Sequence, residues 1–229
     1  MPGLSAQGMT RTLVIGASGG IGAAIRAELE ARGGAVVGLS RSGDGLDLAE
    51  PGSIARVLGD VEGPFDGIVL ATGVLAPEGA EPEKALSAID AGEMARVMAV
   101  NAIGPALVLA HAERLIPKDR VAVIGVLSAR VGSIGDNRIG GWHSYRASKA
   151  ALNQIVRGAA IELRRKRPLS CVVALHPGTV ETSFTADYAG RHKTVPAAEA
   201  AQNLVDLMSG LGPGQTGRFF AYDGKEILW

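Results

Sequence analysis

The sequence predicts an α/β fold, built as a doubly wound parallel sheet in three layers and a single domain. Apolar segments of strand length alternate along the chain with longer segments of helical periodicity. The expected strands are apolar on both faces, as in a parallel sheet that helices cover on both sides. A chain of 229 residues also has the length that one such domain often reaches.

Six apolar segments are expected to form the sheet. The first, residues 12–15 (TLVI), is a short buried run that leads into a glycine-rich turn. Residues 121–127 (VAVIGVL) are apolar throughout, which indicates a strand buried on both faces. In chain order the expected strands are residues 12–15, 35–39, 67–71, 121–127, 171–175 and 218–222.

Helical patterns separate these strands. Ile21, Ile25 and Leu29 recur at helical spacing after the first strand. A long helix carries Tyr145 and is expected to run to about residue 167, because Pro168 cannot continue it. The other expected helices are residues 51–58, which have a proline near their start, 91–115 and 196–209.

Composition excludes several classes of function. The formal net charge is zero, so nothing global indicates nucleic acid or an anionic membrane as a partner. The single Cys171 excludes an internal disulfide and a cysteine-based zinc cluster, and it is compatible with a reducing cytoplasm. The four histidines show no tight metal-ligand spacing, so no metal site is expected.

Two further expectations concern targeting. No apolar run is expected to reach the length of a membrane span. Residues 1–9 lack the basic and apolar segments of a secretory signal, and we interpret them as a disordered lead. The expected catalytic domain is therefore residues 10–229.

The glycine-rich turn after the first strand is a candidate phosphate site. Residues 16–22 (GASGGIG) lie where a strand should end and a helix begin. Glycines there allow close backbone approach, and the amides and dipole of a helix start favour a pyrophosphate. The spacing G-x-x-x-G-x-G differs from the G-x-G-x-x-G fingerprint. The alternative is a glycine-rich turn that binds no ligand.

The end of the second strand indicates which dinucleotide would bind. Enzymes that prefer NAD usually place an acid there for the ribose hydroxyls. This chain has Ser40 and Arg41 instead. Arginine can pair with a 2′-phosphate and serine can donate a hydrogen bond to it, so NADP(H) is the preferred cofactor, with NAD(H) possible. The alternative is an exposed loop arginine with no ligand.

Tyr145 and Lys149 form the candidate catalytic pair. They stand one helical turn apart, so both side chains share one helix face. A nearby ammonium favours phenolate over phenol, and we therefore expect a lowered pKa for Tyr145. A tyrosine tuned in this way can serve as an acid or base near neutral pH.

Taken together, these motifs resemble the short-chain dehydrogenase/reductase family, with its Rossmann-like fold, over nearly the whole chain. The resemblance implies that Asn101, Tyr145 and Lys149 belong to the active site and also contact the cofactor. Ile15 stands where many members have threonine, and the Asn of an Asn-Ala-Gly element is missing before Thr72. The cofactor residues that the resemblance implies are Gly16, Ser18, Gly20, Ile21, Gly22, Ser40, Arg41, Asp47, Leu48, Ala71, Thr72, Gly73, Pro177, Gly178, Val180 and Thr182.

A narrower resemblance is to the C-factor and sniffer-type carbonyl reductase branch of that family. It rests on residues 127–134 (LSARVGSI), 145–149 (YRASK) and 222–229 (YDGKEILW). Phe184, Tyr188 and the residues up to Val195 fall where the family places its substrate lid.

The catalytic serine of the family is the one departure that matters. It usually precedes a glycine by three positions, and counting back from Gly132 that position is Ala129. Ser128 lies one residue earlier, and Ser133 follows the glycine. Neighbouring residues on a strand point to opposite faces, so Ser128 can serve only if the strand end bulges or twists. Ser128 is the preferred candidate, Ser133 is the substitute, and a missing serine role with weak activity is the alternative.

The resemblance implies a hydride transfer between NADPH and a carbonyl or alcohol, with Tyr145 as the acid or base, Lys149 lowering its pKa and Asn101 holding a relay water. It also implies a small-molecule substrate and a homodimer or homotetramer, and the single cysteine favours a cytoplasmic location. A nucleotide-binding regulator or C-factor-like signalling protein with weak or no catalysis is the second interpretation. A sugar-nucleotide epimerase or dehydratase is the third, but it normally needs a longer C-terminal region.

Overall fold

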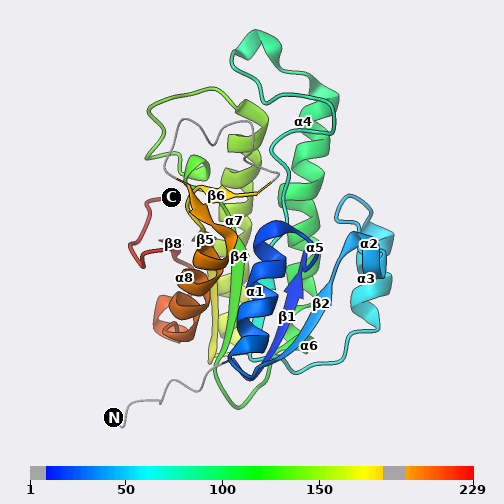
Figure 1. Ribbon diagram of the computed structural model, residues 1–229, viewed down its shortest axis with the longest axis vertical. Coiled ribbons are helices and arrows are strands. Elements are labelled where there is room, and N and C mark those ends of the chain that lie inside the picture. The colour runs from blue at the N-terminus through cyan, green and yellow to red at the C-terminus, as the bar shows by residue number, and fades with distance from the viewer. Residues whose placement is uncertain (1–8, 183–193) are drawn as a thin grey trace.

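A computed structural model describes residues 9–182 and 194–229 of the chain. Its centre is a six-stranded sheet in the order β2-β1-β3-β4-β5-β8, with every neighbouring pair parallel (Figure 1). All six expected strands are confirmed to within two residues at each end. Their bounds are β1 Arg11–Ile15, β2 Ala35–Leu39, β3 Gly67–Leu70, β4 Ala122–Leu127, β5 Ser170–His176 and β8 Phe219–Ala221.

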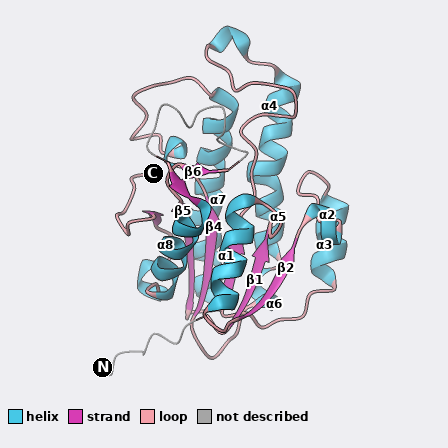
Figure 2. Ribbon diagram, in the orientation of Figure 1, coloured by secondary structure: helices cyan, strands magenta, loops and turns pink. Residues whose placement is uncertain are grey.

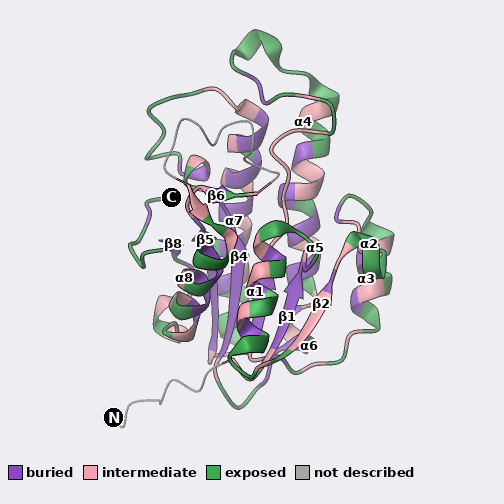
Figure 3. Cartoon of the chain, viewed as in Figure 1, coloured by how far each residue is buried: buried purple, intermediate pink, exposed green. Residues whose placement is uncertain are grey.

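Helices cover both faces of the sheet, which confirms the three-layer prediction (Figure 2). α1 (Gly20–Ala31) and α8 (Ala197–Ser209) pack together on one face. α3 (Pro51–Gly59), α5 (Gly104–Ala110) and α7 (His143–Lys166) contribute to the core cluster on the other face. The strands β1, β3, β4, β5 and β8 are largely buried between these two layers, whereas the edge strand β2 is mostly half-buried and the outer helix faces are exposed (Figure 3).

Local signals account for several element boundaries. α3 has Pro51 at its first turn, where the missing amide costs no hydrogen bond. α4 (Ala91–Met98) begins after Asp90, whose side chain accepts a hydrogen bond from the Glu93 amide at 2.8 Å. α7 ends at Lys166, two residues before Pro168, and its last turn carries three cations that complement the helix dipole.

The expected continuous helix over residues 91–115 is interrupted. α4 passes into a π-helical turn, Ala99–Ile103, before α5 begins, and a further break precedes α6 (Ala112–Leu115). The π turn contains Asn101, and such turns are frequent at functional sites. The hydrophobic periodicity of the sequence does not predict this turn, because the Asn101 side chain that stabilises it bonds to Val74 in the loop after β3.

The stretch Ala91–Ala110 is long and apolar enough to span a membrane by length and composition alone. The expectation that no apolar run reaches this length was therefore wrong. In the fold this stretch packs against α7 and α3, and Val97, Val108 and Leu109 are buried there.

Several small elements were not anticipated. They include α2 (Arg41–Asp44), the short parallel pair β6 (Val180–Glu181) and β7 (Val195–Pro196), and 3-10 turns at Leu86–Ala88, Arg130–Gly132 and Pro213–Gln215. The predicted disordered lead lies outside the described residues except for Met9, which packs against the α1–α8 side of the core.

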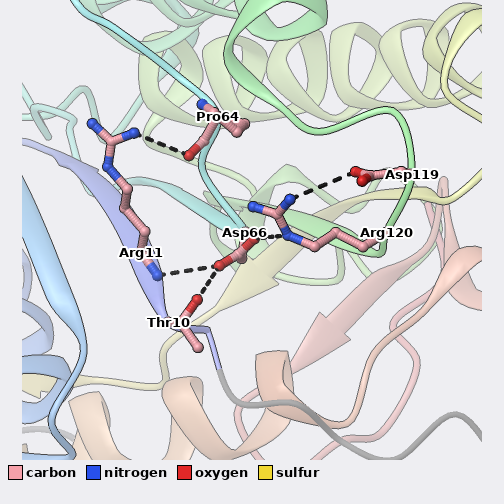
Figure 4. Close-up of polar contacts among 6 residues, drawn as sticks. All are labelled: Thr10, Arg11, Pro64, Asp66, Asp119 and Arg120. Atoms are coloured by element: carbon pink, nitrogen blue, oxygen red, sulfur yellow. Dashed lines mark hydrogen bonds and ion pairs between the residues drawn. The ribbon is translucent and has the colours of Figure 1, made fainter.

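The amino ends of three strands meet at the carboxylate of Asp66, directly before β3 (Figure 4). It accepts hydrogen bonds from the Thr10 hydroxyl, from the Arg11 amide at 3.3 Å and from Arg120 Nε at 2.7 Å. Partial burial alone would raise the pKa of Asp66, but the hydrogen bonds from Thr10 and Arg120 outweigh it and lower that pKa. This clamp joins β1, β3 and β4 at their amino ends, whereas the predicted site residues lie beyond the carboxyl ends.

Candidate active site

The glycine-rich turn lies between the carboxyl ends of β1 and β3, where the strand order of the sheet reverses direction. Such a switch point is where open α/β sheets bind ligands. Gly16 has φ +87°, and a Cβ added to Gly22 would lie 2.1 Å from the Gly16 carbonyl oxygen. The turn therefore admits no side chain at either position. Ser18 is exposed in this turn, and Gly20 and Ile21 begin α1.

The end of β2 lies beside this turn, because the Leu39 carbonyl accepts hydrogen bonds from the Gly16 and Ala17 amides at 2.8 and 3.0 Å. The next residue, Ser40, caps α2 by accepting a hydrogen bond from the Gly43 amide at 3.0 Å. Arg41 begins α2 and is exposed. The structure therefore brings the predicted 2′-phosphate residues next to the predicted pyrophosphate turn.

The predicted adenine residues follow shortly after α2. Asp47 Oδ1 accepts a hydrogen bond from the Ala49 amide at 2.9 Å, and Leu48 is buried. Thr72, after β3, lies against Gly16, with its methyl group 2.9 Å from the position of an added Gly16 Cβ. The buried Thr72 hydroxyl has no hydrogen-bond partner among the described residues. An open polar atom beside a glycine cradle fits a dinucleotide bound at this edge.

Tyr145 and Lys149 lie on the first turns of α7, and both are buried. The Lys149 ammonium is 5.9 Å from the centroid of the Tyr145 ring and donates a hydrogen bond to the Leu127 carbonyl at 3.0 Å. It also lies beneath Gly73, where an added Cβ would come within 3.2 Å of Lys149 Nζ and 3.2 Å of Asn101 Oδ1. The ends of β3 and β4, the π turn and α7 thus converge on this pair.

Burial shifts the proton affinities of both side chains. It raises the pKa of Tyr145, which is opposite to the direction expected from the lysine alone, because loss of hydration disfavours the phenolate. It lowers the pKa of Lys149 to about 8, because the buried ammonium also loses hydration. At neutral pH the phenol therefore keeps its proton, and most Lys149 side chains remain charged.

Asn101 ties the π turn to the loop that follows β3. Its Oδ1 accepts from the Val74 amide at 2.8 Å, and its Nδ2 donates to the Val74 carbonyl at 2.8 Å and to Ser148 Oγ at 3.0 Å. Ser148 in turn donates to the Tyr145 carbonyl at 2.8 Å. Both amide hydrogens of Asn101 are therefore used in fixing its position relative to the tyrosine helix.

The two candidate serines have different surroundings. Ser128 follows β4 and continues its ladder, since its amide donates to the Leu175 carbonyl at 2.7 Å, so the strand end does not bulge there. Its buried hydroxyl donates to Asn153 Oδ1 at 2.6 Å. Ser133 is also buried, and its hydroxyl accepts from the Asp136 amide at 3.1 Å in the following loop.

The segment after β5 reaches back over the glycine-rich turn. Pro177 and Gly178 follow the strand, Val180 lies in β6, and the Thr182 methyl group would be 2.7 Å from a Cβ added to Gly20. The predicted lid residues Phe184 and Tyr188 lie outside the described residues.

Two polar residues of α7 were missed by sequence reasoning. Ser148 links Asn101 to Tyr145 through two hydrogen bonds, and Asn153 accepts a hydrogen bond from the Ser128 hydroxyl. Both are polar and buried in α7. Asn153 follows Lys149 by one helical turn, beside the buried Leu152, so a polar residue on this otherwise apolar stripe was an available signal.

Comparisons with known proteins agree with this architecture. A family model described as "Enoyl-(Acyl carrier protein) reductase" matches residues 16–224. The 1-hydroxy-2-glutathionyl-2-methyl-3-butene dehydrogenase of Rhodococcus sp. (strain AD45) is 31% identical, over 96% of this chain and all of that protein. The C-signal protein of Myxococcus xanthus is 36% identical over 63% of this chain and 84% of its own length.

A solved structure shares the whole fold. The crystal structure of a short-chain dehydrogenase/reductase from Burkholderia multivorans with bound NADP has a TM-score of 0.78 and 26% identity, covering 96% of this chain and all of that one. The family model and the Rhodococcus relative span nearly the complete sequence. The chain therefore belongs to the short-chain dehydrogenase/reductase family and is an NAD(P)-dependent oxidoreductase of that family.

Proposed function

We propose that this protein is an NADP(H)-dependent reductase or dehydrogenase that interconverts a carbonyl and an alcohol, with Tyr145 as the acid or base. The observation that carries the proposal is the buried Tyr145–Lys149 pair beneath Gly73, at the edge where the glycine-rich turn lies. The NADP named for the Burkholderia structure supports the choice of cofactor.

NADPH, when bound, supplies the hydride that reduces the carbonyl carbon. The residues proposed to hold the dinucleotide surround the turn after β1. Gly16, Gly20 and Gly22 admit its phosphates, Thr72 offers an open buried hydroxyl, and Ser40 and Arg41 bind the 2′-phosphate. The remaining proposed cofactor residues are Ser18, Ile21, Asp47, Leu48, Ala71, Gly73, Asn101, Lys149, Pro177, Gly178, Val180 and Thr182.

In the reduction, Tyr145 donates its phenolic proton to the substrate oxygen as that oxygen gains negative charge. Burial keeps this proton on the phenol at neutral pH. The Lys149 ammonium, held by the Leu127 carbonyl, stabilises the phenolate that remains. Asn101 fixes the helix position through Ser148, and its Oδ1 is proposed to hold the water that returns a proton toward Lys149.

Oxidation of NADPH by a panel of aldehydes, ketones and quinones tests the function directly. We expect turnover with at least one class of carbonyl. The C-signal relative and Ala129 at the usual serine position favour a second candidate, a signalling or nucleotide-binding regulator. NADPH binding without turnover on any member of the panel would support that candidate.

Arg41→Asp is expected to reverse the preference for NADPH over NADH. A charge-assisted hydrogen bond contributes about 1.5–3 kcal/mol. The dissociation constant for NADH divided by that for NADPH should therefore fall by roughly 10- to 100-fold. Fluorescence titration with each nucleotide measures the ratio. Arg138→Asp, a change at an exposed loop arginine, is the matched control. An unchanged ratio in Arg41→Asp would retire the 2′-phosphate assignment.

We propose Ser128 as the hydroxyl that hydrogen-bonds the substrate oxygen. The strand end does not bulge there, but the Ser128 hydroxyl already faces α7, the helix that carries Tyr145, through its hydrogen bond to Asn153. To do so its hydroxyl must turn away from Asn153. Ser128→Ala should lower kcat/KM by about 100-fold, as loss of an oxyanion donor does, whereas Ser133→Ala should leave it nearly unchanged. A larger effect from Ser133→Ala would transfer the role to that residue.

The neutral net charge and the small-molecule chemistry agree with a cytoplasmic enzyme that binds neither nucleic acid nor membranes. We propose that it assembles as a homodimer or homotetramer and folds as one catalytic domain over residues 10–229.

A further inference from the structure

Glu83 is a buried acidic residue that the mechanism above does not use. It lies in the loop between β3 and α4 and is 6% exposed. In the described part of the chain, Glu83 and Lys149 are the two buried residues with charged side chains. A buried carboxylate is costly unless it is hydrogen-bonded or paired, so its partners indicate its role.

Those partners all belong to the start of α7. The carboxylate oxygens of Glu83 accept hydrogen bonds from the Ser144 amide at 3.3 and 3.2 Å and from the Ser144 hydroxyl. The Glu83 carbonyl accepts from the Trp142 amide at 2.5 Å. One loop residue therefore holds the backbone on both sides of His143, directly before Tyr145.

The sequence of α7 does not provide this cap itself. Its N-cap residue is Trp142, which adopts a left-handed conformation with φ 50°. An indole N–H can only donate, so this side chain cannot accept from the amides of the first turn. Glu83 supplies the missing acceptor from about 60 residues away in sequence, and its negative charge complements the helix dipole.

The electrostatic state of Glu83 agrees with such a role. Burial alone would raise its pKa, but hydrogen bonds from the Ser144 hydroxyl and from backbone amides, together with nearby His143, lower it. The carboxylate is therefore charged at neutral pH and is a strong acceptor.

The capped turn carries the proposed catalytic phenol. Tyr145 follows Ser144, and the Trp142 ring packs edge-on against the Tyr145 ring at a centroid distance of 6.3 Å. We propose that Glu83 is a positioning residue that caps α7 from the β3–α4 loop and thereby sets the place of the Tyr145 hydroxyl for proton transfer. This inference rests on the proposed function of Tyr145.

The test compares Glu83→Gln and Glu83→Ala with Glu81→Gln in the full chain. Glu81 is the matched control, because its side chain is 78% exposed and pairs only with Lys84 among the described residues. Turnover is measured with NADPH and the most reactive carbonyl of the panel. NADPH affinity and hydrogen exchange over residues 143–150 are measured in the same preparations.

We expect Glu83→Ala to lower kcat by roughly 10- to 100-fold, because small displacements of a reacting group cost this much. NADPH affinity should stay within about twofold, while amides at the start of α7 should exchange faster. Glu83→Gln keeps one acceptor oxygen and should lie between Glu83→Ala and the unsubstituted protein. Glu81→Gln should match the unsubstituted protein in every measurement.

Ser144→Ala provides a second route in case Glu83→Ala does not fold. The two side chains act as one unit. The fold-decrease in kcat of the combined Glu83→Gln/Ser144→Ala variant should therefore be smaller than the product of the fold-decreases of the two single variants. A near-normal kcat in a Glu83→Ala protein that binds NADPH, or in Ser144→Ala if Glu83→Ala does not fold, overturns the inference. So does an equal fall in kcat and NADPH affinity, which would indicate a general structural role.

Failure of the proposed function would look different. If the unsubstituted protein turns over no carbonyl, the proposal for Tyr145 fails, and the hydrogen exchange of α7 still decides whether Glu83 is its cap. Unchanged exchange in Glu83→Ala overturns the capping itself.

Discussion

We expect Tyr145→Phe to bind NADPH as the unsubstituted protein does and to lose nearly all turnover. The change removes only the phenolic oxygen from a buried ring that packs against Trp142, so the fold of α7 should persist. A positioned acid or base contributes about 10²–10⁴-fold to a rate, so kcat should fall by about 100- to 10,000-fold.

The measurement is single-turnover oxidation of NADPH, alongside a fluorescence titration of NADPH binding. Tyr222→Phe is the matched control, because it removes the same atom from a ring that is 40% exposed. Its activity should be near normal. Substantial reductase activity in Tyr145→Phe would show that another group supplies the proton.

Lys149→Met is expected to abolish turnover and also to stabilise the folded chain at pH 7. Burial lowers the pKa of Lys149 to about 8 from 10.5. At pH 7, where Lys149 is charged, burying its ammonium therefore lowers the free energy of unfolding. At about 1.4 kcal/mol for each tenfold change in proton affinity, the loss of stability amounts to about 3 kcal/mol. Methionine fills a similar space without charge, although the Leu127 carbonyl loses its donor at a cost of about 1 kcal/mol.

The gain should therefore be about 2 kcal/mol at pH 7, and it should depend on pH. Between pH 8 and 10.5 the unfolded chain binds the lysine proton more tightly than the folded chain, so the stability of the unsubstituted protein rises with pH across that window. The advantage of Lys149→Met should shrink correspondingly toward pH 10.

Urea unfolding at pH 7 and pH 10 measures both values. Lys166→Met, at the exposed end of the same helix, is the control and should change stability by less than about 0.5 kcal/mol. A Lys149→Met protein that is less stable than the parent at pH 7 would contradict the argument.

The sequence predicted the sheet more completely than the site. Strand segments such as residues 121–127 are apolar because they are buried on both faces, and a continuous apolar segment can be recognised from the sequence alone. The π turn at Asn101 was missed because it depends on bonds to Val74, which no periodicity encodes. Glu83 was missed for the same reason, since its partner lies on another element.

The pKa of Tyr145 shows a different limit. The lysine one turn away was correctly identified, and its presence suggested a lowered pKa. Burial, which depends on the whole fold, raises it instead. Similarly, Ala129 at the usual serine position left two candidate hydroxyls, and the structure adds that the one at Ser128 is engaged with Asn153.

The loop after β3 is fastened to the tyrosine helix at two places, by Asn101 through Val74 and Ser148 and by Glu83 through Ser144. Between these fastenings, residues 78–81 are exposed or half-buried. That span can therefore be replaced or lengthened, for example to insert a reporter peptide, without breaking either contact between the loop and α7.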